Sequence, residues 1–203
     1  GGPSRGVPAG GREVRFAESA RVVRLVARAV DHLHRKGIVH RDLKCDNVIL
    51  GDYGEVVVID WGLAKEVGSF EISAPGGHDP EQYASANPAA TLAGHILGSP
   101  AYMAPEQATG LIDMIGPRTY VYGLCAILYE SLSWQPPFTG KNALEVLVKV
   151  ADVAPDRPSD FVPGIPEVLE QICLKGLEKL PGCRHRSAES LAQAVQSWVS
   201  DLA

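Results

Sequence analysis

The stretch from Ile38 to Gly62 decides how this chain folds, and it reads IVHRDLKCDNVILGDYGEVVVIDWG. Two short apolar runs within it, separated by the turn-forming residues 51–54, predict a β-hairpin. Apolar residues three and four positions apart predict a helix before it, from Ser19 to Leu33, and Gly37 is placed to end that helix. The charged residues between the helix and the hairpin are therefore expected in a loop held by a rigid frame.

The rest of the chain is mostly helical by its apolar spacing. Beyond Pro105, this spacing recurs in four segments, at residues 121–132, 144–148, 168–177 and 191–199. Residues 1–12 are rich in Gly and Pro and are expected to be a disordered linker, which leaves 13–203 as one domain. The predicted fold is mainly α, a helical bundle with a small β-hairpin near its start.

The composition argues against several classes of partner. A net charge of -5 lacks the basic excess of a nucleic-acid-binding protein, so no nucleic acid is expected. The four cysteines show no metal-ligand spacing, which favours free thiols and a cytoplasmic location. The most apolar stretch, 121–132, is too short to span a bilayer and contains Glu130. No membrane segment is expected in these residues, and an anchor outside them stays open.

Four segments lead to a family. The loop 40–47 reads HRDLKCDN, and thirteen residues after Asn47 comes Asp60-Trp61-Gly62. Together they resemble the catalytic loop and the magnesium loop of protein kinases. Residues 98–106, GSPAYMAPE, resemble the end of a kinase activation segment, and 120–138 resemble the central helix of the kinase C-terminal lobe. The residues of these motifs are similar to those of bacterial Ser/Thr kinases. The resemblance implies the C-lobe part of the α+β protein kinase fold.

This resemblance implies roles for four residues in phosphoryl transfer from ATP to a protein substrate. Asp42 would accept or orient the proton of the substrate hydroxyl, and Lys44 would stabilise the transferring phosphoryl group. Asn47 and Asp60 would coordinate Mg²⁺. A lysine two positions after the aspartate fits Ser/Thr kinases better than Tyr kinases.

The resemblance also implies regulatory and structural residues in the same loop. His40 is expected to be a packing residue instead of a base. Arg41 would meet a phosphorylated residue of the activation loop, for which Thr91 and Ser85 are candidates. The alternative, that both are ordinary loop hydroxyls, is equally open.

A second set of residues is implied near the end of the activation segment. Ser99 replaces the usual threonine and keeps its hydroxyl. Glu106 is expected to form a buried ion pair with Arg184, which would hold the activation segment on the helical body. Breaking such a pair typically costs about 3–5 kcal/mol.

Some positions depart from the family pattern. Tyr120 stands where an aspartate usually accepts backbone hydrogen bonds from the catalytic loop, so a looser loop is expected. Cys125 replaces a glycine, where its extra volume is expected to strain the packing. Residues 1–35 contain no lysine and no glycine-loop pattern, so we expect the N-terminal lobe to be absent from this chain.

These observations leave two functions open. The first is a truncated Ser/Thr kinase catalytic domain that is inactive alone, and the second is a truncated pseudokinase that acts as a protein-binding module. A small-molecule phosphotransferase accounts for fewer of the motifs. Apolar residues of the lobe interface, Ile38, Ile59 and Leu63, predict self-association.

Overall fold

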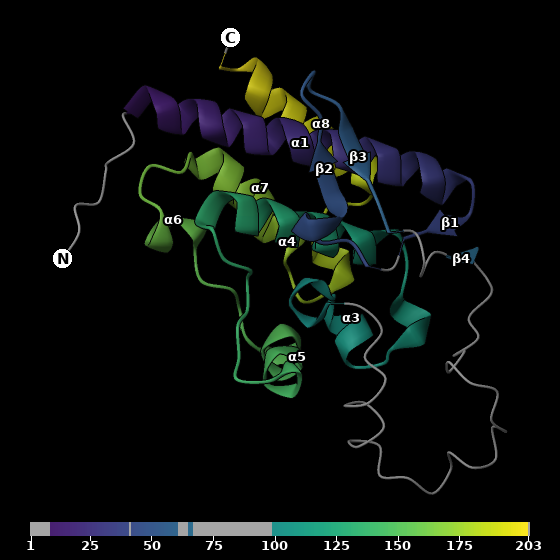
Figure 1. Ribbon diagram of the computed structural model, residues 1–203. Coiled ribbons are helices and arrows are strands. Elements are labelled where there is room, and N and C mark those ends of the chain that lie inside the picture. Colours follow the sequence, from purple (N-terminus) through teal and green to yellow (C-terminus); the bar gives the residue numbers. More distant parts are fainter. Residues whose placement is uncertain (1–8, 41, 61–64, 67–98, 203) are drawn as a thin grey trace, which may run out of the picture.

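The structure is a computed structural model that describes residues 9–40, 42–60, 65–66 and 99–202. Its α-helices and strands are α1 (Ala9–Arg35), β1 (Ile38–Val39), β2 (Val48–Leu50), β3 (Val56–Val58), β4 (Lys65–Glu66), α3 (Pro105–Ala108), α4 (Pro117–Ser133), α5 (Ala143–Asp152), α6 (Pro158–Phe161), α7 (Glu167–Gly176) and α8 (Ala188–Ser200). Short 3-10 turns lie at Cys45–Asn47, Pro100–Tyr102, Ile112–Met114 and Pro181–Cys183. The mainly helical fold predicted from the sequence is confirmed (Figure 1).

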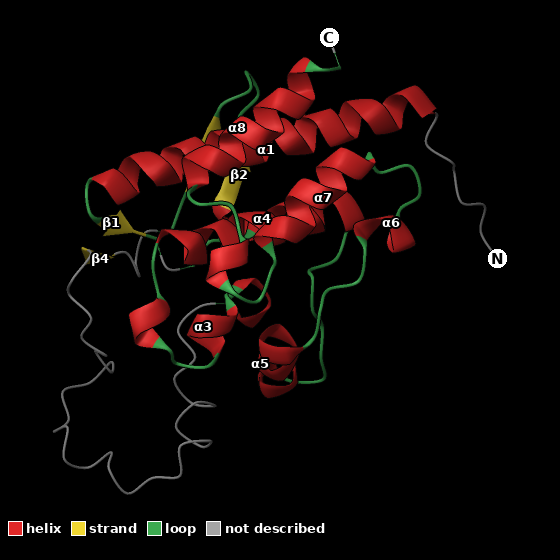
Figure 2. Cartoon of the chain, turned by 180° about the vertical axis from the view of Figure 1, so that it is seen from behind, coloured by secondary structure: helices red, strands yellow, loops and turns green. Residues whose placement is uncertain are grey.

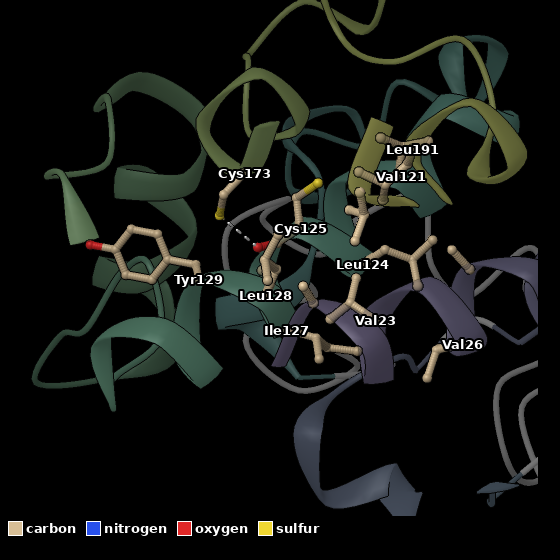
Figure 3. Close-up of a cluster of buried hydrophobic side chains, with 14 of the residues drawn as sticks. Val23, Val26, Val121, Leu124, Cys125, Ile127, Leu128, Tyr129, Cys173 and Leu191 are labelled. Carbon is tan, nitrogen blue, oxygen red and sulfur yellow. Dashed lines mark hydrogen bonds between the residues drawn. The ribbon is translucent and has the colours of Figure 1, made fainter. Parts of the chain in front are cut away.

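The centre of the molecule is α4, because most of its residues are buried. The helix α1 packs against both α4 and α8, and α7 packs against α4 and α8 (Figure 2). Figure 3 shows Val23 and Val26 of α1 approaching Leu124 and Ile127 of α4 in this shared core. One hydrophobic core therefore joins helices that are distant in the sequence.

The first helix begins earlier than its sequence indicates. It starts at Ala9, ten residues before Ser19, so the prediction of a disordered linker is wrong for residues 9–12. The reason is tertiary: Phe16 is fully buried in the core, and its burial favours extending the helix toward the N-terminus. Residues 1–8 lie outside the described part of the chain.

Two small antiparallel sheets lie on either side of the loop 40–47. The predicted hairpin is present, with Val48 opposite Val58 and Leu50 opposite Val56. The strand β1 pairs with β4, which places Ile38 opposite Glu66. The loop 40–47 thus leaves β1 and enters β2, as a loop held at both ends.

The extra volume of Cys125 is accommodated by a glycine on a neighbouring helix. A Cβ atom added to Gly176 would meet the Cys125 Sγ and would lie 2.7 Å from the Cys125 Cβ. The Cys173 Sγ also donates to the Cys125 backbone oxygen at 3.4 Å (Figure 3). The strain expected at Cys125 is therefore avoided by the missing side chain at Gly176.

Across the described residues, no helix is both long enough and apolar enough to cross a membrane.

Candidate active site

His40 joins the loop after β1 to the residue that follows β3. Its side chain is buried, and its Nε2 lies 2.9 Å from the Ile59 backbone oxygen. The Asp42 backbone N–H donates to His40 Nδ1 at 3.4 Å. Since Nδ1 accepts a hydrogen bond, Nε2 carries the ring hydrogen and donates it to Ile59. This buried position agrees with a packing role for His40.

The Asp42 carboxylate is held from two directions. Its Oδ2 lies 3.0 Å from Lys44 Nζ, and its Oδ1 accepts a hydrogen bond from the Ser99 backbone N–H at 3.0 Å. Only 8% of the residue is exposed. The loop before β2 and the segment before α3 therefore meet at one carboxylate.

Electrostatics keeps the pair of Asp42 and Lys44 charged. Burial acts to raise the pKa of Asp42, but the hydrogen bond and charge of Lys44, with hydrogen bonds from Ser99, outweigh it and lower the pKa. The hydrogen bond to Asp42 raises the pKa of Lys44 against the effect of burial, and the charges of Asp42, Asp46 and Asp60 add to it. At neutral pH, Asp42 is a hydrogen-bond acceptor with a cation beside it.

Asn47 and Asp60 lie at the same edge. The Asn47 Nδ2 donates to the Asp42 backbone oxygen at 2.7 Å, and the Asn47 backbone oxygen accepts from the Ile59 N–H at 2.9 Å. These contacts place Asp60, the next residue, beside the loop, where its charge acts on Lys44. Asp60 also has a φ of 62°, in the left-handed region that non-glycine residues seldom adopt.

The donor set suits a magnesium ion that is shared with a phosphate. Asn47 donates through its Nδ2 to Asp42, and its Oδ1 accepts no hydrogen bond from a described residue. Asp60 adds a carboxylate. In the described ranges, no three or more His, Cys, Asp or Glu side chains gather into a metal site. Mg²⁺ commonly takes only one or two protein ligands, with waters and substrate phosphates completing the shell.

Several candidate residues lie outside the described part of the chain. They are Arg41, Trp61, Gly62, Leu63, Ser85 and Thr91.

Tyr102 and Glu130 form a contact near the loop 40–47 that sequence reasoning missed. The Tyr102 hydroxyl donates to the Glu130 carboxylate, which joins the segment after Ser99 to α4. Burial, followed by the hydrogen bond to Glu130, raises the pKa of the Cys45 thiol, so Cys45 belongs to the same cluster. The available signal was Glu130 itself, as the charged residue within the apolar stretch 121–132.

The ion pair predicted between Glu106 and Arg184 is present and buried. Arg184 Nη1 and Nη2 each donate to one Glu106 carboxylate oxygen, both at 2.8 Å. The Thr119 hydroxyl, which the sequence did not single out, also donates to Glu106 Oε1 at 2.7 Å. Burial acts to raise the pKa of Glu106, but the hydrogen bonds from Arg184 and Thr119 outweigh it and lower the pKa.

Comparisons with known proteins identify the family. The family model described as "Protein kinase domain" matches residues 11–196. The chain is 34% identical over 180 residues to Serine/threonine-protein kinase PknD of Chlamydia trachomatis, covering 86% of this chain and 19% of that protein. It is 31% identical to Probable serine/threonine-protein kinase SCO3848 of Streptomyces coelicolor, covering 85% of this chain and 23% of that protein.

A third relative is covered over a larger share of its length. Serine/threonine-protein kinase PknL of Mycobacterium tuberculosis is 30% identical over 183 residues, which is 90% of this chain and 41% of the relative. The chain thus spans between a fifth and two fifths of the length of these relatives. Because the family model covers most of its residues, the chain belongs to the protein kinase family, with relatives among bacterial Ser/Thr kinases.

Proposed function

We propose that this chain supplies the catalytic loop of a protein kinase that transfers the γ-phosphate of ATP to serine or threonine hydroxyls of a protein substrate. The observation that carries the proposal is the Asp42 carboxylate, held by Lys44 and Ser99, with Asn47 and Asp60 at the same edge. The names of the relatives support the choice of serine and threonine as acceptors.

In this proposal each residue acts through the atom that the fold presents. Asp42 accepts the hydrogen of the substrate hydroxyl and directs its oxygen at the phosphorus. Lys44, already paired with Asp42, lies where it can offset negative charge on the transferred group. Asn47 and Asp60 would hold Mg²⁺, which neutralises phosphate charge when bound. Ser99 keeps the Asp42 carboxylate in one orientation.

The test replaces Asp42 by the isosteric asparagine in the protein expressed with all its natural flanking sequence. Asp42→Asn is expected to lower kcat for Mg²⁺-dependent phosphorylation of a Ser/Thr peptide by about 10²-fold or more, the usual size of a general-base contribution. The matched control is Asp52→Asn, an exposed aspartate in the hairpin turn, which should leave kcat unchanged. Equal activity of parent and Asp42→Asn would refute the proposed role.

We also propose that the 203 residues tested alone transfer little phosphate. In kinases a strand lysine and a glycine-rich loop hold the ATP phosphates. These residues contain no lysine before Lys36 and no glycine-loop pattern. Autophosphorylation of the purified 203-residue chain with Mg²⁺ and ATP, lost in Asp42→Asn, would contradict this.

The second candidate is a pseudokinase that binds partner proteins, which Tyr120 favours as a departure from the family pattern. The absence of ATP binding, with and without Mg²⁺, in the naturally flanked protein would favour it.

Self-association of the chain is proposed through the surface around the hairpin. Ile49, Leu50, Val57 and Ile59 are between 37% and 55% exposed there, and an exposed apolar surface of this kind favours association. Sedimentation of the 203-residue chain should show dimers or larger species that decrease in Ile49→Lys. A monomer at all concentrations would contradict the proposal.

A cytoplasmic location is proposed from the four free cysteines.

A further inference from the structure

An aromatic contact joins the last turn of α1 to the first turn of α4. The rings of His34 and Tyr120 have centroids 4.3 Å apart and are tilted by 57°. Tyr120 is only 9% exposed, and the buried His34 Nε2 has no hydrogen-bond partner among the described residues. The His34 side chain is therefore held by the packing of the two rings and not by a hydrogen bond from Nε2.

The backbone of His34 also determines how the chain enters the catalytic loop. Its backbone oxygen accepts a hydrogen bond from the Gly37 N–H at 2.9 Å, and Gly37 has a φ of 75°. This left-handed turn ends α1 and directs the chain into β1 and then to His40. One residue thus stacks on α4 with its side chain and forms the turn before the catalytic loop with its backbone.

Tyr120 also lies near Asp42 within the loop itself. It lines a small cavity together with Asp42 and Ser99, the two residues joined by the Ser99 N–H hydrogen bond. Its neighbour Thr119 donates to Glu106 at 2.7 Å. Movement of Tyr120 would therefore change the lining of the cavity beside Asp42.

We propose that Tyr120 and His34 are positioning residues for phosphoryl transfer, and that their ring pair keeps the Asp42 carboxylate in place against Ser99 and Lys44. This inference rests on the proposed kinase function. In this proposal the pair acts through the backbone that leads into the loop, and neither ring contacts the substrate. Burial lowers the pKa of His34 against the charge of Asp31, which keeps the ring uncharged and suited to packing at neutral pH.

The first experiment measures kcat and KM in the protein with its natural flanking sequence. Tyr120→Ala and His34→Ala are each expected to lower kcat about tenfold or more, with little change in KM, because displacements of about 1 Å at a catalytic group can cost about 10²-fold. The double variant should lose no more than either single variant, since both remove the same contact. Tyr120→Phe and His34→Phe keep the rings and are expected to retain most of kcat.

The matched control is Tyr129→Ala. Tyr129 is buried on α4 like Tyr120 and lies nine residues after it. Its hydroxyl donates to the Asp156 backbone oxygen at 3.0 Å. Its loss should lower Tm while leaving kcat unchanged at temperatures where the variant is folded. An equal loss of kcat in Tyr129→Ala would show that general destabilisation explains the effect. A loss in Tyr120→Phe as large as in Tyr120→Ala would assign the effect to the hydroxyl. Either result overturns the proposal.

A second measurement needs no catalytic activity. Hydrogen exchange of the Asp42 amide, which donates to His40 Nδ1, reports directly on the loop. Tyr120→Ala should accelerate it at least about tenfold relative to amides in the centre of α8. Inactivity of the parent protein, together with this acceleration, would refute the kinase function and leave the ring pair as the support of the loop. Unchanged exchange at Asp42 in an active parent would refute the ring pair alone.

Discussion

The substitution Glu106→Gln tests how strongly the activation segment is held to the helical body. It removes the charge facing Arg184, whose side chain is fully buried. Leaving one member of a buried pair without its partner typically costs about 3–5 kcal/mol. Arg184 keeps hydrogen bonds to the backbone oxygens of Glu178 at 2.7 Å, Lys179 at 2.8 Å and Arg118 at 3.1 Å. Because these acceptors remain, we expect the lower end, about 3 kcal/mol.

The pH dependence of this loss has a definite sign. The pKa of Glu106 in the folded chain lies below its ordinary value of 4.5. A carboxyl with a lowered folded pKa stabilises the fold fully above its unfolded pKa, and this contribution is lost as the pH falls through the folded pKa. The difference between parent and Glu106→Gln should therefore be constant from about pH 6 to 8 and should shrink below about pH 4.5.

Thermal unfolding followed by circular dichroism measures both effects. A chain of this size loses about 2–4 °C in Tm per kcal/mol, so Glu106→Gln should unfold about 6–12 °C below the parent at pH 7. The control is Glu145→Gln, which removes an exposed partner of Lys149 and should not change Tm measurably. A decrease under about 2 °C at pH 7, or an equal decrease at pH 4, would refute the reasoning.

Three further outcomes follow from particular contacts. Gly176→Ala should lower the free energy of unfolding by about 1–3 kcal/mol in urea titrations, because its Cβ would meet Cys125; the same loss in a Cys125→Gly background would contradict this cause. Lys44→Met should raise the pKa of Asp42 in an NMR titration of its carboxyl group, since Lys44 supplies the main lowering contacts; an unchanged pKa would show that Ser99 alone is sufficient. Burial lowers the pKa of Lys179 to about 8, so the free energy of unfolding should rise from pH 8 toward 10.5, where the unfolded chain still holds the proton. Partial exposure reduces this rise, and Lys179→Met should flatten it; equal slopes in urea titrations of the two proteins would count against the shift.

The local elements of the fold could be predicted because their signals lie close together in the chain. The turn residues 51–54 and the apolar runs beside them predicted the hairpin, which the structure contains with Val48 opposite Val58. The start of α1 could not be predicted in this way. Gly and Pro near the N-terminus indicated a linker, whereas the burial of Phe16 against distant helices favours helix from Ala9.

In the candidate site, too, some residues could be predicted from sequence motifs and others could not. Family motifs indicated Asp42, Lys44, Asn47 and Asp60, and the structure brings these residues to one edge. The role of each in catalysis stays a prediction. The contact of Tyr102 with Glu130 joins residues 28 positions apart, and no spacing rule links them.

The positions of the longer helices, the turn of the hairpin and the polar residues that share one loop could all be predicted from the chain alone. These properties depend on neighbours within a few positions of each other. Two further features, the space that Gly176 leaves for Cys125 and the stacking of His34 on Tyr120, became visible only in the folded molecule. Such contacts join elements that are distant in the chain, and they depend on how side-chain volumes fill one shared core.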